Sequence, residues 1–125
     1  GVSYASGLST YEVVSTYLQA ASTPAPTYYG ETGAGGTSIK LTDDLGLTAP
    51  SYGVSGRVEI FGPHIAAYTN IIASLSYEAD GTLNTESATT AAARKSTVAV
   101  NAVRFFMTSG NIASGTITMY GLRNS

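Results

Sequence analysis

Cysteine and tryptophan are absent from this chain of 125 residues, and there is a single histidine. Without cysteine the chain has no disulfide, thiolate zinc site or cysteine nucleophile. Charge is scarce, because Asp, Glu, Lys and Arg make up 11% of the residues, whereas about 25% is usual. The net charge of -2 leaves no basic face that could neutralise phosphates. Binding to nucleic acid is therefore not expected.

Long apolar runs are missing as well, so the sequence predicts neither membrane insertion nor a signal peptide. What the chain has instead is 17 Thr, 15 Ser, 14 Gly and nine Tyr, with 43% hydrophobic residues. This composition is typical of a folded chain rather than a disordered one. We expect an N-terminal arm over residues 1–9 and a single domain over residues 10–125. Since Gly1 stands where an initiator Met is usual, we expect the chain to derive from a longer protein.

Short runs of β-branched and aromatic residues, separated by Gly, Asn and Asp, predict an all-β fold. The expected strands cover residues 11–18, 38–42, 57–61, 68–78, 97–108 and 115–122. Residues 21–37 are expected to form a loop, because Pro and Gly are poor residues for a central strand. Residues 85–95 are the one place where a helix is plausible, with a single turn or a loop as alternatives. Short strands at this spacing favour an antiparallel β-sandwich of the jelly-roll type.

Side chains suited to catalysis are few. The single histidine, His64, follows Gly62 and Pro63, where a surface loop is the simpler interpretation. It has no cysteine to join it in a metal site, and Asp43 and Asp44 lack the alternating acids of a calcium loop. We therefore predict no catalytic residue, no metal site and no cofactor.

Two pairs of carboxylates keep a glycan hydrolase open as a less favoured alternative. Hydrolysis of a glycosidic bond needs two carboxyl groups on either side of that bond. The candidate pairs are Glu78 with Asp80, and Glu12 with Glu59. Asp80 is already explained by the Asp-Gly pair that favours a hairpin turn, and Glu78 by the polar face of its strand. A structural role is therefore the simpler interpretation of the first pair.

Three tyrosines are the candidates for binding a glycan. Tyr28 and Tyr29 fall within the Gly- and Pro-rich stretch, and Tyr52 lies in a second flexible stretch. Flat amphipathic rings stack on sugars, and loops at the end of a sandwich can present such rings. The alternative is that each tyrosine is half-buried against the sandwich or against a neighbouring subunit.

The last 23 residues, VRFFMTSGNIASGTITMYGLRNS, carry a recognisable pattern. An Arg-Phe strand, a Ser-Gly turn, an Ile-Ala-Ser-Gly step and a final Gly-Thr-Ile-Thr-Met-Tyr-Gly-Leu strand together resemble the C-terminal ends of tailed-bacteriophage tail fibre and tailspike proteins. Met119 stands where that family has Leu. We expect Ile117 and Met119 to fill the core, Tyr120 to pack on the other side, and Gly121 to permit a bend. The residues expected to carry the core and motif are Val103, Phe105, Ile117, Met119, Tyr120 and Gly121.

The resemblance implies a homotrimeric jelly-roll module at the tip of a host-recognition fibre, and thus an extracellular location in the virion. Its partners would be two further copies of the chain and a bacterial surface polysaccharide or protein. It implies no catalysis here, since the depolymerase region of a tailspike would lie upstream. A structural jelly-roll protein of the virion, such as a capsid or decoration subunit, is the main alternative.

Overall fold

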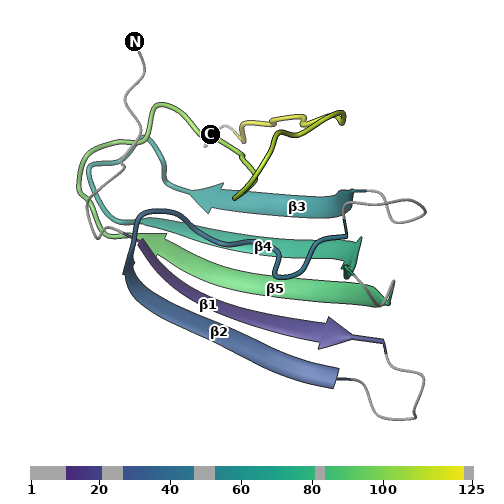
Figure 1. Cartoon of the computed structure of the whole chain (residues 1–125). Coiled ribbons are helices and arrows are strands. Elements are labelled where there is room, and N and C mark those ends of the chain that lie inside the picture. The colour runs from purple at the N-terminus through teal and green to yellow at the C-terminus, as the bar shows by residue number, and fades with distance from the viewer. Residues whose placement is uncertain (1–10, 21–26, 47–52, 81–83, 123–125) are drawn as a thin grey trace.

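The structure is a computed structural model that describes residues 11–20, 27–46, 53–80 and 84–122. Within these ranges the protein is all-β and contains no helix, as the sequence predicts. The strands are β1 (Tyr11–Gln19), β2 (Thr27–Gly36), β3 (Val54–Phe61), β4 (Thr69–Glu78) and β5 (Thr85–Arg94). They form one antiparallel sheet in the order β2-β1-β5-β4-β3 (Figure 1). The described residues build this one sheet and no second layer of strands, and the expected arm, residues 1–9, lies outside them.

Strands β1, β3 and β4 lie where the sequence predicts strands. In β4, Ala73 and Tyr77 are buried while Ser74 and Ser76 are exposed, which is the expected alternation of faces. The strands β4 and β5 are antiparallel neighbours, and the Ala79 N–H donates to the Asn84 carbonyl at 3.0 Å. The turn expected at Asp80 and Gly81 lies partly outside the described residues, because Gly81 is not among them.

The central strand of the sheet is β5, so the expectation of a helix, turn or loop at residues 85–95 is wrong. It pairs with β1 on one side and with β4 on the other. Its buried positions are Glu86, Ala88, Thr90 and Ala92, and the residues between them are exposed. The helix propensity of the alanines is overridden because small side chains fit between the larger residues of two neighbouring strands. One such position is Ala88, whose partners across the sheet are Tyr17 and Leu75.

Strand β2 corrects a second expectation, since residues 21–37 were expected to form a loop. Residues Thr27–Gly36 pair with β1 along its whole length, and the register shifts between Tyr11 and Glu12. The strand is at the edge of the sheet and pairs on one side only. An edge position tolerates glycines that would weaken a central strand.

Residues 37–46, which we call the strap, cross one face of the sheet and form no strand of the sheet (Figure 1). The strand expected at residues 38–42 is therefore wrong. The end of the strap is fixed by backbone contacts: the Gly46 N–H donates to the Glu78 carbonyl at 2.8 Å, and Leu45 forms an isolated bridge with Ala79. Alternation of Ile and Leu made a strand plausible, but the backbone of the strap bonds to the end of β4 instead of to a strand edge.

The core lies between the strap and the sheet. Tyr17 of β1, Tyr77 of β4 and Ala88 of β5 are its buried residues, and Leu45 of the strap and Leu75 pack against them. Tyr17 and Tyr77, on the two strands next to β5, therefore fill most of the space over the small side chains of β5.

The C-terminal part, residues 97–122, forms no strand, so the two strands expected there are absent. A backbone hydrogen bond connects it to the loop after β3, where the Val100 N–H donates to the Pro63 carbonyl at 2.6 Å. The side chains of Ile117 and Met119 are 64% and 73% exposed, so the expectation that they fill the core of this chain is wrong. Their alternation is suited to a strand, but a strand needs a neighbouring edge to pair with.

Among the other residues of the C-terminal motif, some are half-buried and others are exposed. Val103 and Phe105 are half-buried, whereas Tyr120 is 84% exposed and does not pack on the opposite side of a core. A side chain at Gly121 would meet no atom within 4 Å, so crowding does not require glycine at this position.

Candidate functional site

The two faces of the sheet differ in chemistry. One face, the covered face, lies under the strap and consists of Ser15, Tyr17, Ala73, Leu75, Tyr77, Glu86, Ala88, Thr90 and Ala92. The other, the open face, consists of Val14, Thr16, Leu18, Ser55, Arg57, Glu59, Ile72, Ser74, Ser76, Ser87, Thr89 and Ala91. The residues of the open face are exposed or, for Thr16, half-buried. The open face is therefore the candidate binding surface of the described residues.

Hydroxyl groups form a row across the open face. Thr16 of β1 pairs with Thr89 of β5, and Thr89 pairs with Ser74 of β4. Neighbouring strands are about 4.8 Å apart, so the three hydroxyls follow one another at that spacing. Each hydroxyl can both donate and accept a hydrogen bond, and a sugar ring requires both. This row can bind a polyhydroxylated ligand without any charged group.

An apolar row runs beside the hydroxyl row. Val14 of β1, Ala91 of β5 and Ile72 of β4 pair with one another across the three strands. Val14 is 57% and Ile72 is 47% exposed, which is high for aliphatic side chains in the middle of a sheet. Aliphatic residues adjacent in this way form a continuous apolar strip, which is a feature of interaction surfaces.

Charged groups lie at the margins of the sheet and are paired. The Arg57 guanidinium contacts the Glu59 carboxylate at 3.2 Å on β3, and the Lys95 ammonium contacts the Glu12 carboxylate at 3.0 Å. All four side chains are well exposed, so these pairs contribute little to stability. They leave the centre of the open face without net charge.

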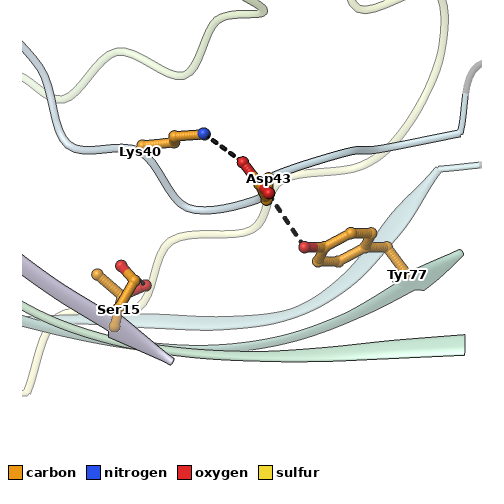
Figure 2. A network of polar contacts seen from close by, with 5 residues as sticks. Ser15, Lys40, Asp43 and Tyr77 are labelled. Atoms are coloured by element: carbon orange, nitrogen blue, oxygen red, sulfur yellow. Dashed lines mark hydrogen bonds and ion pairs between the residues drawn. The ribbon is translucent and has the colours of Figure 1, made fainter. Parts of the chain in front are cut away.

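Beneath the strap, polar groups are joined across the core. Figure 2 shows the Tyr77 ring directed at the strap, where its Oη accepts a hydrogen bond from the Asp43 N–H at 3.0 Å. Asp43 also forms an ion pair with Lys40. Burial raises the pKa of the Tyr77 hydroxyl, and the hydrogen bond from Asp43 opposes this by a smaller amount. The tyrosine therefore acts here as a neutral anchor for the strap.

Glu86 is the notable group on the covered face. Its side chain is fully buried, and neither carboxylate oxygen has a hydrogen-bond partner within the described part of the chain. Burial raises the pKa of its carboxyl group. The sequence analysis missed this residue because residues 85–95 were not expected to be a strand. The available signal was the two-residue alternation through Glu86, Ala88, Thr90 and Ala92.

The tyrosines expected to bind glycan are only partly placed. The backbone of Tyr28 pairs with that of Leu18, and that of Tyr29 pairs with Tyr17, within β2 and β1. The side chains of Tyr28 and Tyr29 lie outside the described part of the structure, as does the whole of Tyr52. The expected role of these three residues stays a prediction.

The structure does not bring the second candidate carboxylate pair together. Glu12 is on β1 and Glu59 is on β3, with β5 and β4 between them. Each carboxylate forms an ion pair of its own, Glu12 with Lys95 and Glu59 with Arg57. In the part of the chain that the structure describes, no group of three or more His, Cys, Asp or Glu residues is arranged to hold a metal ion.

The fold and its open face define an all-β protein built on a single antiparallel sheet. Comparisons of the chain with protein-family models, with curated proteins and with solved structures found no match. Across the four described ranges, no helix has the length and apolar character that crossing a membrane requires. What the chain does must therefore be argued from its own residues and surfaces.

Proposed function

We propose that this chain is the C-terminal module of a phage tail fibre or tailspike, and that three copies associate to contact a glycan on the host surface without catalysis. The proposal combines the resemblance of the C-terminal motif with the physical properties of the sheet. The observation that carries it is the exposed apolar row of Val14, Ala91 and Ile72 on the open face of a single copy.

A jelly-roll sandwich needs a second layer over an apolar face. In the proposed homotrimer, neighbouring copies supply that layer over the apolar row of Val14, Ala91 and Ile72, and the adjacent row of Thr16, Thr89 and Ser74 stays open to the glycan. Three identical chains around a threefold axis repeat this contact and close the assembly. The low charge of the sheet supports the arrangement, because few charged groups would have to lose water on association.

Glycan binding is supported by the chemistry of the open face and by the tyrosines of the sequence analysis. The row of Thr16, Thr89 and Ser74 offers neutral donors and acceptors, and the proposed stacking residues are Tyr28, Tyr29 and Tyr52. A bacterial surface polysaccharide matches this combination of hydroxyls and flat rings.

The test replaces Tyr28 and Tyr29 together with Ala. We expect binding to host cells and to purified surface polysaccharide to weaken about thirtyfold, since each of the two lost stacking contacts is worth on the order of 1 kcal/mol. The matched control is Tyr68→Ala, because Tyr68 is a tyrosine outside the proposed site and is 56% exposed. Binding by the double variant that equals binding by the wild type would remove these residues from the site.

A structural protein of the virion is the second candidate function. The exposed apolar row on the open face favours it, because such a strip suits a permanent contact between protein subunits as well as it suits a fibre tip. A stable trimer that binds no member of a broad glycan array and no host cell would favour this candidate.

A further inference from the structure

The last residues of the described chain form an extended segment rich in exposed apolar side chains. In residues 116–122, which we call the C-terminal segment, Ile117, Met119 and Leu122 are 64%, 73% and 96% exposed. None of these residues is part of a strand in the structure. The threonines of this segment, Thr116 and Thr118, alternate with Ile117 and Met119 in the two-residue pattern of a half-buried strand.

The outer edge of β3 offers such a segment a place to pair. β3 is the last strand of the sheet and pairs only with β4, so one side of its backbone has no partner strand among the described residues. Val58 and Ile60 are half-buried on the covered side of β3, whereas Arg57 and Glu59 are exposed on the open face. Edge strands of this kind are templates for addition of a further strand.

We propose that the C-terminal segment of one copy adds as a strand to the outer edge of β3 in a second copy. This inference rests on the proposed self-association and specifies its contact. In the added strand, Ile117 and Met119 lie beside Val58 and Ile60 of the neighbouring copy. Thr116 and Thr118 lie on the polar side, with the charged residues of β3.

A second copy is the occupant that the structure favours. The Val100 N–H donates to the Pro63 carbonyl at 2.6 Å, which brings the chain to the end of β3 within its own copy. Among the described residues, the C-terminal segment forms no strand and does not join β3 of its own copy in the sheet. Because its own copy leaves Ile117, Met119 and Leu122 largely exposed, a second copy is the partner that would cover them.

Two adjacent substitutions test the proposal with a built-in control. Ile117→Asp places a charge on the apolar side of the added strand, and Thr118→Asp places the same charge on its polar side. Both positions are exposed within a single copy, so we expect both variants to keep the circular dichroism of the wild type. Sedimentation velocity should show the Ile117→Asp variant as single chains at tens of micromolar, while Thr118→Asp keeps the mass of the wild type.

Hydrogen exchange of the β3 amides is the second measurement. We expect the outward-facing amides of β3 to exchange at least tenfold faster in the Ile117→Asp variant than in the wild type and in Thr118→Asp. The Met119→Lys variant should repeat both results, which guards against a defect particular to one substitution.

The possible failures are distinguishable. If the Ile117→Asp and Met119→Lys variants both form an assembly of the same mass as the wild type, the strand addition is overturned and the proposed function stands. A monomeric wild type would contradict the proposed function itself. A monomer whose β3 amides lose protection in Ile117→Asp would show that the segment pairs within its own copy, which also overturns the proposal.

Discussion

Glu86 illustrates how a single residue limits the stability of this sheet. Its carboxyl group is buried on the covered face, near the start of β5, without a hydrogen-bond partner among the described residues, and burial raises its pKa. Above the ordinary pKa of a glutamate, the unfolded chain has released this proton while the folded chain still holds it. Stability is therefore full below the ordinary pKa and falls as the pH rises towards the raised pKa of the folded state.

Replacing Glu86 with Gln tests this at the residue scale. A neutral amide removes the desolvation of a carboxylate, so we expect the free energy of unfolding at pH 8 to rise by about 1–3 kcal/mol. At pH 4 the variant and the wild type should be nearly equal, because the glutamate is then largely protonated in both states. Urea denaturation at the two pH values measures the difference.

The control for this experiment is Glu59→Gln, because Glu59 is an exposed glutamate that contacts Arg57 at the surface. We expect its stability to stay within about 0.5 kcal/mol of the wild type at both pH values. A Glu86→Gln variant that is less stable than the wild type at pH 8 would contradict the account of Glu86.

At the scale of elements, the strap is held against the sheet by a small number of contacts. Removing the Tyr77 hydroxyl in Tyr77→Phe leaves the Asp43 amide without its acceptor. We expect a loss of about 1 kcal/mol in the free energy of unfolding and faster hydrogen exchange at Asp43. Tyr68→Phe, which alters an exposed ring, should change neither quantity. An Asp43 amide equally protected in both variants would show that the hydroxyl does not anchor the strap.

The sequence predicted the elements whose alternation involves large side chains. β4 was found because Ile71, Leu75 and Tyr77 contrast with serines on the other face. β5 was missed because its buried positions are small, as at Ala88 and Thr90, and its stability as a strand comes from the neighbours that pair with it. Local propensity carries no information about those neighbours.

The opposite error occurred in the strap and in the C-terminal segment. Ile39 with Leu41, and Ile117 with Met119, alternate as residues of a strand do, yet neither segment has a strand as its partner in the structure. The candidate binding surface also depends on strand pairing, which local sequence does not reveal. The row of Thr16, Thr89 and Ser74 joins residues from three strands and exists only once the sheet order is known.

At the scale of the whole molecule, a single five-stranded sheet with one strap leaves an apolar row, an open edge and an apolar C-terminal segment exposed. Each of these features is unfavourable in a chain that stays alone in water. Together they support the proposal that copies of the chain cover these features in one another. The assembly would then present the glycan-binding surface.

The most direct measurement is sedimentation equilibrium of the purified chain over a hundredfold range of concentration. The account predicts a single species with three times the chain mass of 12.8 kDa at tens of micromolar. Dissociation should appear only on dilution, as mass action requires. A mass equal to one chain throughout the range would contradict the account.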